Sequence, residues 1–121
     1  VFHIPHGCCN AILLPSVIEF NAKVCAERYA AIARHIGLPG KTDEQLTNAL
    51  VDSVKALNKK LEIAQTYKEN GVSEELLNEH ADAIAANAVL DPCTSSNPRK
   101  IDKEQMKQVL LCAYYGMPVT F

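Results

Sequence analysis

Three apolar segments of this chain each follow a residue that commonly caps a helix, and this repeated pattern restricts the fold more than any other feature. Thr42 precedes the first segment with Gln45 three residues later, a capping-box arrangement, and Ser73 and Asp102 precede the other two. In the first segment, apolar residues recur three or four positions apart: Leu46, Leu50, Val54 and Leu57. No stretch carries a strand pattern. The sequence therefore predicts an all-α domain.

The N-terminal part predicts two further helices, at about 7–20 and 25–36. Pro15 lies inside the first and removes one backbone donor, so we expect a kink there. This helix is apolar on most sides, which is typical of a helix buried at the centre of a domain. The second helix ends at Gly37 and has an apolar stripe that we expect to face inward: Val24, Tyr29, Ile32, Ala33 and Ile36. The whole chain is thus expected to form a bundle of about five to six helices.

Size, charge and cysteine content exclude several classes of protein. With 121 residues the chain is expected to form a single domain, residues 1–121, with a small core. A formal charge of −2 without a basic cluster argues against a nucleic-acid partner. No apolar run reaches the roughly 18 residues that span a bilayer, so we expect no membrane association. The five cysteines are an odd and scattered set, which favours reduced thiols and a cytoplasmic location.

His6 is the first candidate for chemistry, because it stands beside Gly7 where the first apolar helix begins. Neutral imidazole is the commonest protein ligand for divalent metals, but zinc or iron(II) needs three or four ligands. His3 is a possible partner, although Pro5 indicates that it lies outside the helix. Cys8 and Cys9 form a rival site with His6, but adjacent helical residues point about 100° apart. A histidine that only forms local hydrogen bonds at the helix start is the remaining interpretation.

The polar segment 91–99 is the second candidate, since a loop of this kind either covers a pocket or simply joins two helices. Arg99 can meet an anion there, but a solvated arginine is the simpler expectation. His35 and His80 are expected to be surface residues or residues with satisfied hydrogen bonds. The chain has no glycine-rich phosphate loop and no Ser/His/Asp arrangement.

The segment from Pro5 to Pro15 reads PHGCCNAILLP and resembles the iron-containing (group III) alcohol dehydrogenases. That family carries His-Gly, a small residue, and then Asn-Ala-hydrophobic-Leu-Leu-Pro. The similarity continues at residues 19–21 and 28–33. It returns at Cys93-Thr94 and Asn97-Pro98-Arg99, which resemble the family's Cys-Thr-x-x-Asn-Pro-Arg. The resemblance runs through essentially the whole chain in order.

The resemblance implies a C-terminal helical domain of the dehydroquinate synthase-like, iron-dependent alcohol dehydrogenase fold. In that family an N-terminal α/β domain binds NAD or NADP, and the helical domain completes a metal site in the cleft between the two. The metal, Fe(II) or Zn(II), is held by one Asp and three His, of which His6 matches the last. The other ligands and the nucleotide-binding domain would lie upstream, so the chain is expected to be a C-terminal fragment.

The resemblance also implies the reaction of the parent enzyme, the NAD(P)-dependent interconversion of a small primary alcohol and its aldehyde. Cys93 would lie near the cleft and shape the substrate pocket, without a catalytic role. We expect the isolated chain to be inactive. Exposed apolar surface left by a missing domain would favour self-association, so a homo-oligomer is expected. The alternative is a non-catalytic helical module that presents its first helix to a partner.

Overall fold

The computed structural model describes residues 6–121, with side chains from residue 7 onward. This part of the chain is all-helical, which confirms the predicted fold class, and contains no strand. Its elements are α1 (His6–His35), α2 (Asp43–Lys60), α3 (Glu74–Leu90), the 3-10 helix η1 (Pro92–Ser96) and α4 (Lys103–Tyr115). The described residues thus form four α-helices, fewer than the predicted five to six.

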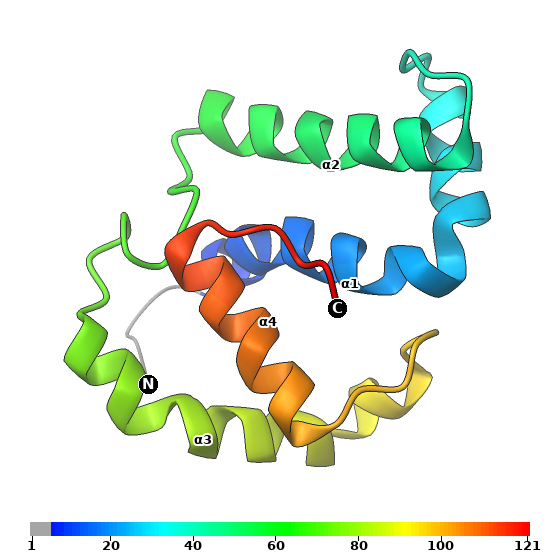
Figure 1. Cartoon of the computed structure of the whole chain (residues 1–121). Coiled ribbons are helices and arrows are strands. Elements are labelled where there is room, and N and C mark those ends of the chain that lie inside the picture. Colours follow the sequence, from blue (N-terminus) through cyan, green and yellow to red (C-terminus); the bar gives the residue numbers. More distant parts are fainter. Residues whose placement is uncertain (1–5) are drawn as a thin grey trace.

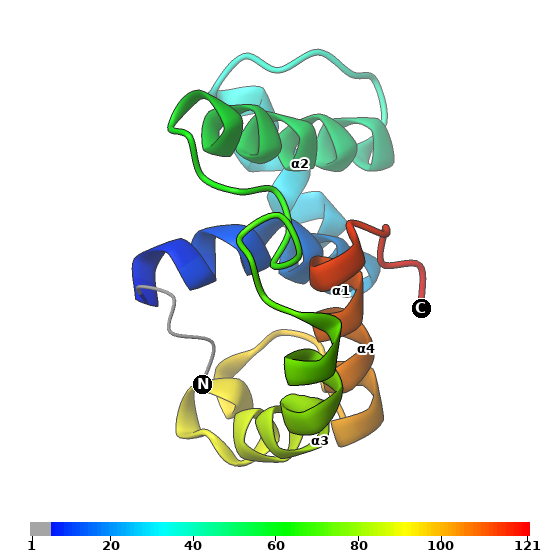
Figure 2. The same cartoon turned by 90° about the vertical axis from the view of Figure 1, so that its left-hand side faces the viewer.

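The missing helix is explained by α1, a single helix of 30 residues that covers both of the predicted N-terminal helices. The four residues between the predicted helices, 21–24, include neither Gly nor Pro, so nothing in them breaks the backbone hydrogen bonds. Pro15 is also accommodated within α1. The helix bends in its lighter-blue part, so that its two halves run in different directions (Figures 1 and 2).

The predicted caps are present at the starts of the other three α-helices. The side chain of Thr42 accepts from Gln45 N and that of Ser73 from Leu76 N. Asp102 and Gln105 form a complete capping box. At α2 only half of the box forms, because the side chain of Gln45 accepts from Lys41 N instead of Thr42 N.

The helices are arranged around α1 and α4. α1 packs along α2 on one side and against α4 on the other, and α3 packs against α4. Figures 1 and 2 show α2 and α3 at opposite ends of the domain, with α1 and α4 between them. Among the described residues the backbones of α3 and α1 do not pack directly on each other; α3 packs on α4, and side chains of α1 and α3 belong to the same core cluster.

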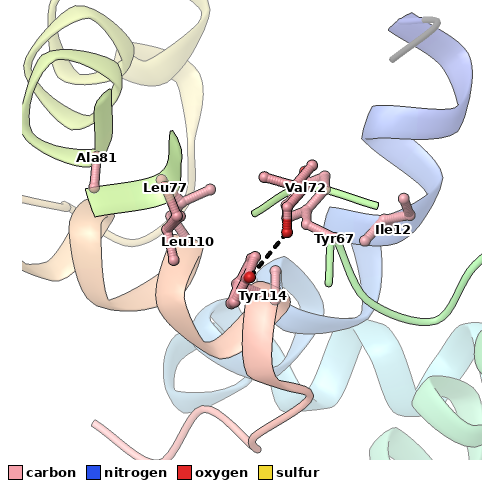
Figure 3. Packing of buried hydrophobic residues seen from close by; sticks show 8 residues of the cluster. Ile12, Tyr67, Val72, Leu77, Ala81, Leu110 and Tyr114 are labelled. Carbon is pink, nitrogen blue, oxygen red and sulfur yellow. Dashed lines mark hydrogen bonds between the residues drawn. The ribbon is translucent and has the colours of Figure 1, made fainter. Parts of the chain in front are cut away.

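The main core lies where α1, α3, α4 and the α2–α3 loop meet. Tyr67 and Tyr114 are its largest fully buried side chains. The Tyr114 hydroxyl donates to the carbonyl oxygen of Val72 at 2.8 Å (Figure 3). The buried members are Ile12, Tyr67, Val72, Leu77, Ala81, Leu110, Ala113 and Tyr114. Two smaller clusters surround Phe20 and Ala33.

The second half of α1 buries only part of the stripe that the sequence predicted. Ala33 is fully buried as expected, beside Ala30, Leu46 and Leu50, and Tyr29 packs against this cluster. Val24, Ile32 and Ile36 were also expected to point inward, but their exposed fractions are 57%, 49% and 54%. Small side chains let the two helices approach closely, so α1 packs on α2 through its alanines although neighbouring residues of α1 are more apolar.

By length and composition alone, α1 is apolar enough to cross a membrane. The sequence predicted two shorter helices here, and neither is long enough to span a membrane. One such helix is weak evidence, because the core helix of a soluble protein meets the same criterion. Here α1 packs against both α2 and α4. The absence of membrane association stays a prediction.

Candidate functional site

His6 is the first residue of α1, which agrees with its predicted place at a helix start. Its side chain and His3 lie outside the described residues, so its role as a metal ligand and the pairing with His3 stay predictions. The next residue, Gly7, is exposed, and a Cβ placed there would meet no atom within 4 Å. Packing within the described part of the chain therefore gives no reason for a glycine at this position.

Cysteines do not supply an alternative metal site from residue 7 onward. No group of three or more His, Cys, Asp or Glu side chains is placed to hold a metal in this part of the chain. The Sγ of Cys9 lies 3.4 Å from the hydroxyl oxygen of Tyr67, and Cys8 is partly buried. The rival site that joins Cys8 and Cys9 to His6 stays a prediction, because the side chain of His6 lies outside the described part.

Two buried side chains bind the main chain of α1 just after His6. The Tyr67 hydroxyl donates to the carbonyl oxygen of Cys9 at 3.0 Å. The Asn58 amide Nδ2 donates to the carbonyl oxygen of Ala11 at 2.9 Å. Burial and the contact with Cys9 raise the pKa of Tyr67 far above its usual value, so this phenol remains a donor at any physiological pH. Sequence analysis identified neither Asn58 nor Tyr67.

Cys93 is an exposed free thiol in η1, directly after α3. The side chain of Asp91 accepts from Cys93 N at 2.8 Å and thereby starts this short helix. The segment predicted as one polar loop is therefore ordered by its own caps. A surface groove of about 780 Å³ lies at the end of α2, lined by residues that include Lys55 and Glu69 but not Cys93.

The residues after η1 attach this segment to the middle of α1. Asn97 and Asn21 exchange two side-chain amide hydrogen bonds, at 2.9 and 2.8 Å. Arg99 donates from Nη1 to the carbonyl oxygens of Phe20 and Phe121, both at 2.7 Å, and its guanidinium lies 4.0 Å from the centre of the Phe20 ring. The expectation that Arg99 is solvated was therefore wrong. Its partners are main-chain oxygens, which carry no signal in the sequence.

The start of α1, where His6 lies, and η1, which carries Cys93, are separate parts of the domain. The contacts after η1 reach Phe20 and Asn21, which lie about 15 residues beyond His6, or roughly 22 Å along an α-helix. In Figure 1 the yellow η1 segment lies well apart from the dark-blue start of α1. The described contacts thus do not bring these two predicted site residues together.

Comparison with known proteins places these features in a family. A sequence model of the Fe-containing alcohol dehydrogenase family, C-terminal part, matches residues 1–114. An NADPH-dependent butanol dehydrogenase of Clostridium saccharobutylicum is 51% identical over all of this chain, which covers 31% of that protein.

Two solved structures are also similar to this chain. A 1,3-propanediol oxidoreductase superposes on 94% of the chain with a TM-score of 0.84 and 27% identity. An iron-containing alcohol dehydrogenase from Thermococcus thioreducens superposes on 93% with a TM-score of 0.81 and 32% identity. The chain covers 29% of each of these structures and therefore spans about a third of the length of its relatives.

Proposed function

This chain belongs to the Fe-containing alcohol dehydrogenase family as its C-terminal domain, and we propose that it completes the metal site of an NAD(P)-linked dehydrogenase acting on a small alcohol. The observation that carries the proposal is the family match over residues 1–114, which includes the His-Gly motif at the start of α1. The reaction would interconvert a primary alcohol and its aldehyde. The nucleotide-binding domain would precede this chain in a longer protein.

In this proposal His6 is the metal ligand that the chain contributes. An imidazole suits both Fe(II) and Zn(II), and no other three-ligand group is available among residues 7–121. A metal bound there would polarise the alcohol or aldehyde oxygen as a Lewis acid. The part played by this chain is to hold the imidazole at a fixed point of a helix, whose first turns are anchored by Asn58 and Tyr67.

Cofactor and substrate follow from the relatives. The 51% identical relative is named an NADPH-dependent butanol dehydrogenase, so we infer NADPH and a short linear alcohol for the whole protein. The cofactor would be bound mainly by the upstream domain. Cys93 would line the substrate pocket from the C-terminal domain, as an exposed thiol at a capped turn. A cytoplasmic homo-oligomer completes the proposal.

The proposal is tested with the full-length protein that carries this chain. The His6→Ala variant should lose most of its bound iron or zinc, measured by metal analysis, and at least about a hundredfold in NADPH-dependent reduction of butyraldehyde. His35→Ala is the matched control, since His35 is exposed at the other end of the same helix. If His6→Ala keeps both metal and turnover while folded, His6 is not a ligand.

A second candidate function, a helical interaction module, is favoured only by the exposed residues Val24, Ile32 and Ile36. A domain removed from its enzyme would expose apolar surface for another reason. The two functions differ in what precedes the chain. An upstream reading frame that encodes a nucleotide-binding domain supports the dehydrogenase, and turnover by the isolated chain would contradict the shared-site proposal.

A further inference from the structure

Pro15 leaves an acceptor without its ordinary partner inside α1. In an α-helix the carbonyl oxygen of Ala11 accepts from the N–H of residue 15, and proline has no N–H. The amide Nδ2 of Asn58 takes that place at 2.9 Å. Asn58 is only 6% exposed and lies near the end of α2, far from Ala11 in the sequence. Its buried amide therefore supplies the donor that Pro15 removes.

Tyr67 makes a second bond to the main chain of α1, two residues (about half a turn) closer to His6. Its hydroxyl donates to the carbonyl oxygen of Cys9, and its ring packs beside Ile12 in the main core (Figure 3). Tyr67 is itself held in place, because its N–H donates to Ala113 O and its carbonyl oxygen accepts from Val72 N. Tyr67 as a whole is only 1% exposed, so its hydroxyl is held as a fixed donor.

We propose that Asn58 and Tyr67 are positioning residues for the metal ligand His6. The carbonyl groups that they bind belong to the third and fifth residues after His6, within the first two turns of the helix that carries it. A helical backbone is stiff over this distance, so fixing these two oxygens fixes the point from which the imidazole extends. The inference rests on the proposed function, since it requires His6 to bind the metal.

Positioning differs from general stabilisation in what it affects. Metal affinity and geometry respond to displacements of a ligand that are too small to unfold the domain. Loss of a buried hydrogen bond elsewhere in the core should lower stability without moving His6. Thr47 offers such a comparison, because its buried hydroxyl also reaches main-chain oxygens, of Asp43 at 2.7 Å and of Ala26 at 3.3 Å, which lie 20 or more residues beyond His6.

The experiment uses the full-length protein loaded with Co(II) in place of the native metal. Two quantities are measured: the Co(II) dissociation constant by competition with a chelator, and the d–d absorption bands, which report ligand geometry. Asn58→Leu should weaken binding by about ten- to a hundredfold and shift the bands. Tyr67→Phe should act in the same direction, more weakly, because the Cys9 oxygen still accepts from the N–H of residue 13 in the ordinary helical way. Thr47→Val should change neither quantity by more than about twofold.

A rescue variant separates positioning from a nonspecific effect of Asn58→Leu. Replacing Pro15 by Ala restores an N–H that can donate to Ala11 O in the ordinary helical way. The double variant Pro15→Ala/Asn58→Leu should therefore recover most of the affinity and the wild-type bands. It also provides a folded protein if Asn58→Leu alone fails to fold.

The outcomes are distinguishable. If His6→Ala removes binding while Asn58→Leu and Tyr67→Phe behave like Thr47→Val, the positioning role is wrong and the proposed function stands. Failure of Pro15→Ala to rescue Asn58→Leu also overturns the positioning role. If His6→Ala leaves Co(II) affinity unchanged, the proposed function and the positioning role fall together.

Discussion

Replacement of Arg99 by Ala should be among the most destabilising single changes outside the apolar core. The guanidinium makes two hydrogen bonds, to Phe20 O and Phe121 O, and stacks on the Phe20 ring. A hydrogen bond from a charged group contributes about 1.5–3 kcal/mol and a cation–π contact about 0.5–1 kcal/mol. Arg99 is partly exposed, and contributions made by one side chain are not additive. We therefore expect Arg99→Ala to lower the free energy of unfolding by about 2–4 kcal/mol.

The assay is urea denaturation at 25 °C followed by far-UV circular dichroism, because the chain has no tryptophan. Arg99→Lys should lose roughly half as much, since an ammonium cannot reproduce the planar pair of bonds and the stacking. Arg34→Ala is the matched control. Arg34 pairs with Asp43 at 3.1 Å but its side chain is 55% exposed, so it should cost no more than about 1 kcal/mol. Equal costs for Arg99→Ala and Arg34→Ala would refute the structural role of Arg99.

Two further predictions concern protonation and backbone conformation. Burial raises the pKa of the Glu19 carboxyl above 4.5 in the folded protein. The protonated carboxyl therefore stabilises the fold below pH 4.5, and this stabilisation is lost as the pH rises through the raised pKa. In Glu19→Gln, the urea concentration at the unfolding midpoint should fall less between pH 4 and 8 than in the unchanged protein. The same pH dependence in both proteins would contradict this prediction. In the same assay, Gly37→Ala and Gly116→Ala should each lower the free energy of unfolding by at least about 1 kcal/mol. The loss should be larger for Gly116→Ala. Both have φ near +80°, but only at Gly116 would the new Cβ lie 3.1 Å from another side chain, Thr66; equal losses would show that this contact relaxes freely.

The starts of three helices were predictable from the sequence because each is decided locally. The side chains of Thr42, Ser73 and Asp102 each accept from the N–H three residues later. Both partners therefore lie within one short segment, where the residue types alone indicate a cap. The partial failure at Gln45 has the same local scale, because its side chain bonds one residue earlier than the standard box. The family resemblance likewise depended on short local motifs, and the match over residues 1–114 confirmed it.

The contacts that shape the candidate site were not predictable in this way. Asn58 and Arg99 reach carbonyl oxygens 47 and 79 residues away, and every residue of the chain offers such an oxygen. Pro15 did predict a missing donor in the first helix, but nothing in the sequence indicated which side chain would replace it. The stripe on the second half of α1 was right for Ala33 but wrong for Val24, Ile32 and Ile36, since periodicity identifies an apolar face but not how much of it a partner covers.

A common feature of these long-range contacts suits the proposed role of His6 as a metal ligand at the start of α1. Asn58, Tyr67 and Arg99 all bind main-chain oxygens of α1, the first two near His6 and the third near its middle. Bonds to the main chain fix a helix whatever side chains it carries, so they hold α1 without limiting the chemistry of the residue at its start. Substitutions that break them should displace α1 locally, so those nearest His6 should affect the proposed metal binding more strongly than those at Arg99 do.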